Sequence, residues 1–101
     1  MIVKVYAYRD IQIGAFNKPF YDTNDSEVVK TQVARTVSLS SIEDIEKAHL
    51  RDLELYYLGT FDDESGVIHS DVKFLIRLDK YCRKEKVDDE QSVQIGSKEE
   101  N

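Results

Sequence analysis

The stretch "LYYLGTFDDESGVI", residues 55–68, places three acids and a glycine between two apolar runs. Asp and Ser side chains hydrogen-bond their own backbone in turns, and Gly66 can adopt a positive φ at no steric cost. We therefore interpret "FDDESG", residues 61–66, as a β-turn between two strands. A partner-facing acidic loop and a metal or catalytic loop are the alternatives.

Neither a metal loop nor a catalytic loop finds in the sequence the other ligands or catalytic groups that it needs. A calcium loop needs oxygen ligands at alternating positions over about twelve residues, ending in a bidentate acid, and that register is missing. A hydrolytic carboxylate pair needs a second acid or a histidine held opposite, and the sequence indicates none. His49 and His69 lack a nearby cysteine, so a metal site would have to be assembled with Asp52 or Asp71. We expect surface or capping histidines and no metal or cofactor.

Strands are predicted on both sides of the turn. Apolar residues occupy both alternating sets of "LELYYLGTF", residues 53–61, which indicates a strand covered on much of both faces. Alternation over residues 72–79 favours another strand, although a helix beginning near Asp71 could use the same residues. At the N-terminus, "IVKVYAY", residues 2–8, predicts a strand. "IQIGAF", residues 11–16, predicts a hairpin or a bulged continuation with Gly14 at the irregular point, and "NKPFYD" an extended segment.

One principal helix is predicted between these strand pairs. Val29, Val33 and Val37 recur every four residues, and Asn24 with Glu27 suggests an N-cap, so the helix covers about residues 25–38. Ser41 with Asp44 suggests a second cap, followed by at most two helical turns. The predicted fold class is α+β: a small, mainly antiparallel sheet with one principal helix, in the order ββαββ.

Length and composition predict one domain, residues 1–86, followed by a flexible acidic tail, residues 87–101. The sequence shows no apolar run of membrane-spanning length and no export leader, and its single cysteine, Cys82, cannot form an internal disulfide. We expect a cytoplasmic protein with no membrane contact. A sheet too short to hide its edges makes a homodimer plausible, through an edge or a sheet face.

The net charge of −6 is divided into blocks. Residues 41–66 carry eight acids against two cations, whereas residues 67–86 carry six cations against three acids. Cations neutralise phosphates, and an aromatic ring can stack on an unpaired base, so this basic block suits single-stranded nucleic acid. A solvated strand edge or helix face is the alternative. The predicted nucleic-acid-binding residues are Lys73, Arg77, Lys80, Tyr81, Arg83, Lys84 and Lys86.

The N-terminal aromatic residues offer a second possible surface. Such residues stack on bases when exposed, but in strands they more often form core. The candidates are Tyr6, Tyr8, Phe16, Phe20 and Tyr21, with Lys4 and Lys18.

Two segments resemble the small nonstructural proteins of gokushovirus-type Microviridae, which are phages with single-stranded DNA genomes. They are "YAYRDIQIGAFNKPFY", residues 6–21, and "HLRDLELYYLGTFDDESG", residues 49–66. The sequence departs from the family pattern at Leu50, Arg51 and Leu53. The matching residues are Pro19, Phe20, His49, Asp52, Leu55, Tyr56, Leu58, Gly59, Phe61, Asp62, Asp63, Glu64 and Gly66.

The resemblance implies a nonstructural, DNA-binding phage protein that assists genome replication or packaging. With the basic block, it predicts a non-enzymatic protein that binds single-stranded DNA weakly and in a salt-sensitive way in the host cytoplasm. The competing hypothesis is a regulator that contacts a host or viral protein through its acidic surface.

Overall fold

The computed structural model describes residues 1–83, and the fold is α+β, with a five-stranded antiparallel sheet and one main helix. The predicted acidic tail, residues 87–101, lies outside the described residues, and so do Lys84 and Lys86 of the basic block. The strands are β1 (Ile2–Asp10), β2 (Ala15–Phe16), β3 (Phe20–Asp22), β4 (Leu53–Asp62) and β5 (Ile68–Arg77). The helices are α1 (Ser26–Leu39) and α2 (Ile42–Lys47), with short 3-10 turns at Leu50–Asp52 and Leu78–Tyr81.

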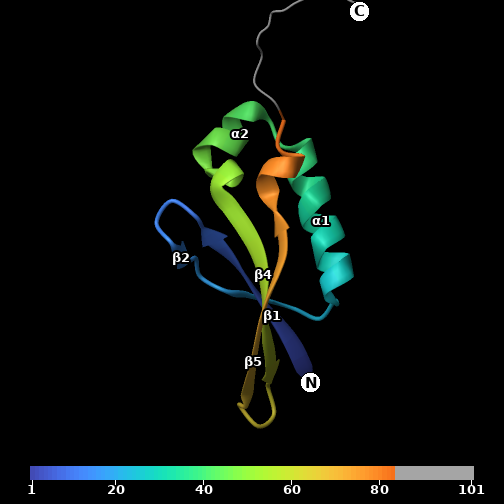
Figure 1. Ribbon diagram of the computed structural model, residues 1–101. Coiled ribbons are helices and arrows are strands. Elements are labelled where there is room, and N and C mark those ends of the chain that lie inside the picture. The colour runs from blue at the N-terminus through green and yellow to red at the C-terminus, as the bar shows by residue number, and fades with distance from the viewer. Residues whose placement is uncertain (84–101) are drawn as a thin grey trace, which may run out of the picture.

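The sheet is built around β1 and β4. These two long strands pair along their lengths, β5 pairs the other side of β4, and β2 and β3 both pair the far side of β1. In Figure 1, α1 runs beside one half of the sheet and α2 lies at that same end. The turn between β4 and β5 lies at the opposite end, near the N-terminus, where the strands extend beyond the helices (Figure 1).

The observed element order is βββαββ, which adds one short strand to the predicted order. Residues 11–14 form a turn that Gly14 closes by donating to the Asp10 carbonyl at 2.9 Å, so the predicted hairpin is confirmed with only Ala15–Phe16 as its second strand. Pro19 cannot donate a hydrogen bond, and pairing with β1 resumes only at Phe20. The extended segment that follows Pro19 therefore becomes a separate strand.

Helix α1 forms where the valine spacing predicts it. Val29 and Val37 are buried and Val33 packs against them, so the apolar stripe faces the sheet. The predicted N-cap is wrong by one residue: Asp25 caps the helix, its side chain accepting from the Val28 N–H at 3.1 Å. Ser41 caps α2 as predicted, and α2 buries Ile45 completely.

The core lies between the helices and one face of the sheet. Tyr6 and Leu55 of the sheet are fully buried there, and Leu78 follows β5 into the same cluster. The Tyr6 hydroxyl donates to the Asn24 carbonyl at 2.9 Å, which ties β1 to the start of α1. No helix within residues 1–83 is long and apolar enough to cross a membrane.

Candidate functional site

The acidic stretch at residues 61–66 is a turn between two strands, as predicted. The Asp62 N–H donates to the Val67 carbonyl at 2.9 Å, and the Gly66 N–H donates to the Asp62 carbonyl at 2.8 Å. The Asp62 carboxylate accepts from the Glu64 N–H at 2.9 Å, and this bond lowers the pKa of Asp62. Within the described residues, no group of three His, Cys, Asp or Glu side chains could hold a metal ion.

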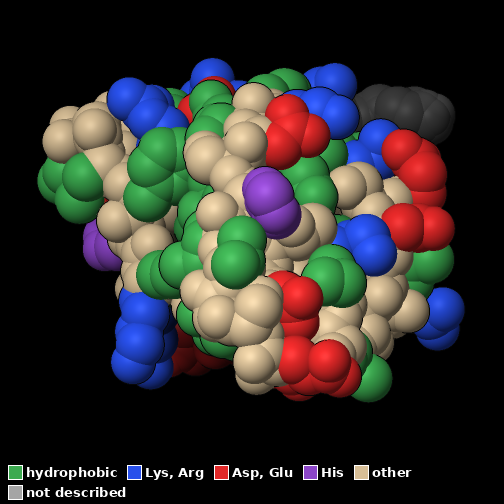
Figure 2. Space-filling view, turned by 90° about the horizontal axis from the view of Figure 1, so that it is seen from below, with side chains coloured by type: hydrophobic (Ala, Val, Ile, Leu, Met, Phe, Trp, Pro, Cys, Tyr) green, Lys and Arg blue, Asp and Glu red, His purple; other side chains and the backbone are tan. Residues whose placement is uncertain are grey.

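The acids beyond Asp62 in this turn contact the start of the chain. The Met1 amine lies 2.7 Å from Asp63 Oδ1 and 3.4 Å from Glu64 Oε2. The hydrogen bond with Asp63 raises the pKa of the amine. These carboxylates are exposed. Figure 2 views the molecule from the end that bears the β4–β5 turn, and acidic side chains lie on this surface.

The predicted basic block does not form a single cationic surface. Lys73 is exposed on β5, with its Nζ 3.3 Å from Asp71 Oδ2, and it lines a hollow with Lys4 and the start of α1. Arg77 lies at the end of β5, with its Nε 3.3 Å from Asp79 Oδ2. A neighbouring acid therefore offsets the charge of each.

The remaining described members of the block follow β5: Lys80 and Tyr81 lie in the 3-10 turn Leu78–Tyr81, and Arg83 comes two residues after it. Lys80 is exposed, whereas Tyr81 is half-buried and packs against the hydrophobic core. The Arg83 carbonyl accepts a hydrogen bond from Arg51. The structure thus holds Tyr81 by packing, and the stacking role predicted for it stays a prediction.

Two members of the block lie on opposite faces of the sheet because β5 is bulged. Lys73 pairs with Tyr57, whose ring contacts the core, whereas Arg77 pairs with Glu54 on the other face. Residues 73 and 77 would share a face in a regular strand. The register shift opposite Leu55 and Tyr56 changes the face.

The face of the sheet away from the helices, which we call the open face, carries a row of aromatic side chains. Phe16 of β2, Tyr56 of β4 and Phe74 of β5 form it. The Phe16 and Tyr56 ring centroids are 5.1 Å apart, the Tyr56 and Phe74 centroids are 5.6 Å apart, and both pairs meet edge to face. Phe16 is 43% exposed and Phe74 53%. This aromatic row therefore presents ring surface to solvent.

Two arginines lie along one side of the aromatic row, next to Glu54. Arg9 and Arg77 are the cross-strand neighbours of Glu54 on either side, and Arg9 Nη1 lies 3.7 Å from Glu54 Oε1. Arg77 Nε is buried and makes no hydrogen bond, even though Asp79 is close. The Arg77 side chain as a whole is 43% exposed, so the exposed part of its guanidinium can contact a phosphate while a base stacks on the row.

An apolar groove of about 430 Å³ continues along the open face from the aromatic row. Tyr21 and Ile68, which are both more than half exposed, lie on opposite sides of it. None of the lining side chains is charged. The groove is lined by Val5, Phe16, Pro19, Tyr21, Leu58, Gly59, Phe61, Ile68, Ser70 and Val72.

The N-terminal aromatic residues divide between the two faces. Tyr6 is fully buried, and Tyr8 and Phe20 pack against the core, so these three contribute to stability. Phe16 and Tyr21 are exposed on the open face. Tyr56 and Phe74 were not among the predicted binding residues, although the alternation in residues 53–61 and 72–79 is the signal that could have placed them on one face.

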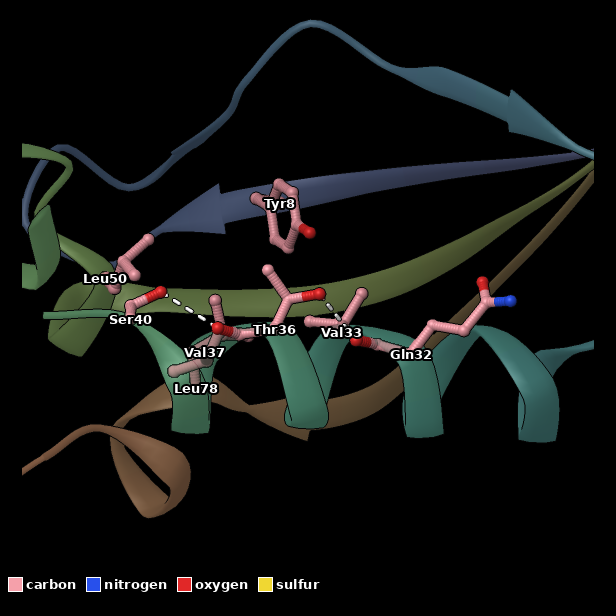
Figure 3. A pocket seen from close by; sticks show the side chains of 8 residues that line it. All are labelled: Tyr8, Gln32, Val33, Thr36, Val37, Ser40, Leu50 and Leu78. Carbon is pink, nitrogen blue, oxygen red and sulfur yellow. Dashed lines mark hydrogen bonds between the residues drawn. The ribbon is translucent and has the colours of Figure 1, made fainter.

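A smaller pocket of about 230 Å³ lies between α1 and the sheet (Figure 3). The Ser40 hydroxyl donates to the Thr36 carbonyl and the Thr36 hydroxyl to the Gln32 carbonyl, each at 2.9 Å, so both hydroxyls are satisfied within the helix. Tyr8 points into the pocket from β1, and burial raises its pKa (Figure 3). Val33, Val37 and Leu78 of the hydrophobic core line this pocket, so it is a gap in the packing between α1 and the sheet.

Comparison with known proteins places the chain among phage proteins. A family model described as Phage ORF5 protein matches residues 3–81, a range that covers every strand and helix described above except Ile2, the first residue of β1. Neither curated protein sequences nor solved structures give a match. The match spans more than three quarters of the sequence, and the chain belongs to the Phage ORF5 protein family.

Proposed function

We propose that this phage protein is a nonstructural, non-enzymatic protein that binds single-stranded DNA and assists replication or packaging of a microvirus genome in the host cytoplasm. The observation that carries the proposal is the exposed aromatic row Phe16–Tyr56–Phe74 with Arg9 and Arg77 at its side. Unpaired bases expose the faces that such rings stack on, whereas the bases of a duplex do not. Of the predicted basic block, the proposed surface keeps only Arg77, and it adds Arg9 and the aromatic row.

Stacking carries more of the proposed binding than charge does. Asp71 and Asp79 offset Lys73 and Arg77, and Glu54 lies between the two arginines of the open face. Two or three phosphate contacts predict a log-log salt slope of about −1.5 to −2 for a single strand. We therefore expect binding that is weak, salt-sensitive and independent of base sequence.

The test is fluorescence anisotropy with a labelled oligothymidylate at two or more salt concentrations. Phe74→Ala removes an exposed ring of the row, and loss of one stacked base predicts an affinity about 5-fold to 150-fold lower at an unchanged salt slope. Leu39→Ala is the matched control, because Leu39 is 73% exposed at the end of α1 and lies off the open face. Equal affinities for Phe74→Ala and Leu39→Ala would contradict the stacking role.

Charge is tested separately. Arg77→Gln is expected to make the salt slope shallower by about 0.7, the value of one phosphate contact on a single strand. Lys47→Gln, which changes an exposed lysine of α2, is expected to leave the slope unchanged. If duplex binds as tightly as the oligothymidylate, the proposal of base stacking is wrong.

The alternative function is a regulator that binds a host or viral protein through its acidic surface. Exposed carboxylates on α2 and on the β4–β5 turn favour it, among them Glu43, Asp44, Asp63 and Glu64. Affinity capture from infected cells with the intact protein, compared with a variant in which these four acids are amides, distinguishes the two functions. A partner lost with the acids, together with no salt-sensitive DNA binding, would support the regulator.

A further inference from the structure

The apolar groove lies on a part of the sheet that no other element of the described chain covers. A sheet that is apolar on both faces needs a packed layer on each, and here the helices supply only one. On the open face Val72 is 57% exposed, Tyr21 62% and Ile68 71%. Apolar side chains gathered in this way on a sheet face mark an interaction site.

The chemistry of the groove argues for a protein surface as its occupant. A nucleic acid strand in the groove would find no cation for its phosphates, because none of the ten lining side chains is charged. The two arginines of the open face lie beyond the aromatic row, at the other end. Because its lining side chains are almost all apolar, the groove can bind a partner mainly through shape and apolar contact.

The area of the groove fits a second copy of the chain. At about 200 Å² for a fully exposed large side chain, Tyr21, Ile68 and Val72 together present about 400 Å² of apolar surface, without Phe16 of the aromatic row. Two copies packed face to face would bury about 800 Å² from these side chains alone. The half-buried Val5, Leu58 and Phe61 and the surrounding backbone bring the total to about 1,000 Å², the size at which specific interfaces begin.

The groove also offers complementary shapes to a copy of itself. Tyr21 stands on the β3 side and Ile68 on the β5 side, so each copy has projecting apolar side chains on both sides of a hollow of about 430 Å³. In a two-fold dimer the same patch serves both partners, and no charge on either patch is left unpaired by the contact. We propose that the apolar groove is a self-docking surface through which two copies associate face to face.

The test is the mass of the intact protein by sedimentation equilibrium, from about 1 to 200 μM and without DNA, because an interface of this size supports association in the micromolar range. The wild-type protein is expected to move from monomer toward dimer across this range. Ile68→Asp places a charge in the interface and is expected to weaken dimerisation at least tenfold. Ile68→Thr, which keeps the β-branched shape, is expected to weaken it less.

Leu39→Asp is the matched control, since Leu39 is 73% exposed against 71% for Ile68 and lies off the open face. It is expected to dimerise like the wild type. The proposal is overturned if the wild type stays monomeric throughout the range, which would leave the groove to another protein, or if both Ile68 variants associate as well as Leu39→Asp. Since no DNA is present, this result is independent of the proposed function.

Discussion

Gly59 is the position at which the sheet is least tolerant of a side chain. Its φ is 138°, and a Cβ added there would lie 1.9 Å from the carbonyl oxygen of His69 on β5. The next nearest atoms are also backbone, at 3.0 and 3.2 Å, so no rotamer change can make room. Gly59→Ala must therefore push β5 away from β4 by roughly 1 Å or more, the shortfall from an ordinary contact.

The cost of Gly59→Ala can be worked from these contacts. A non-glycine residue held at this φ costs about 1 to 3 kcal/mol, and separating the strands weakens one or two backbone hydrogen bonds worth about 0.5 to 1.5 kcal/mol each. We expect a loss of about 3 kcal/mol or more in the free energy of unfolding. For a domain of this size that lowers Tm by about 12 to 24 °C.

Gly66 provides the matched control within the same hairpin. Its φ is 78°, but an added Cβ would meet nothing within 4 Å. Gly66→Ala is therefore expected to lower the free energy of unfolding only by the cost of a positive φ, about 1 kcal/mol. Urea unfolding followed by circular dichroism measures both variants, with equal m-values as the check that the unfolding reaction is the same. If the two variants lose the same free energy within about 0.5 kcal/mol, β5 does not approach Gly59 as closely as described.

The remaining predictions concern the buried tyrosines. Tyr6→Phe removes the bond to the Asn24 carbonyl and is expected to cost about 1 kcal/mol by urea unfolding, whereas Tyr21→Phe, at an exposed ring, is expected to cost nothing measurable. Burial raises the pKa of Tyr6 and of Tyr8, so the folded state holds these protons more tightly than the unfolded state does. Their contribution to stability is therefore complete below about pH 10, the unfolded pKa, and is lost as pH rises through the folded values. Urea unfolding between about pH 8 and 11 is expected to show this decline, less steeply in Tyr6→Phe, and constant stability would contradict it.

The fold could be predicted from the sequence where one local pattern determines one element. Valines at every fourth residue have a single helical face, and an acidic turn closed by glycine between two alternating runs forms a hairpin. The predicted N-cap of α1 was wrong because Asn24 and Asp25 are both residue types that cap helices well. The Asp22 carboxylate holds the Asn24 N–H and Tyr6 holds the Asn24 carbonyl, which leaves Asp25 as the cap.

The candidate site could be predicted only in part, because it depends on strand register. Counting cations identified Arg77, but nothing local showed that the bulge beside Leu75 separates it from Lys73. The aromatic row needs Phe16 to reach Tyr56 across β1, where the small Ala7 pairs with Tyr56. The contact joins the N-terminal β1–β2 hairpin to β4, which is distant in the sequence, so no single window of sequence contains it.

The acidity of this protein restricts how it could hold DNA. A net charge of −6 repels a polyanion at long range, and Lys73 and Arg77 of the basic block sit beside acids that reduce their field. Duplex DNA offers a protein mainly phosphate charge and groove edges, and this surface has little to match them. An unpaired strand also offers base faces, which stack on aromatic rings whatever the net charge. Under the proposed function, the exposed row Phe16–Tyr56–Phe74 would therefore favour single strands over duplex, because stacking acts at short range and does not depend on long-range attraction.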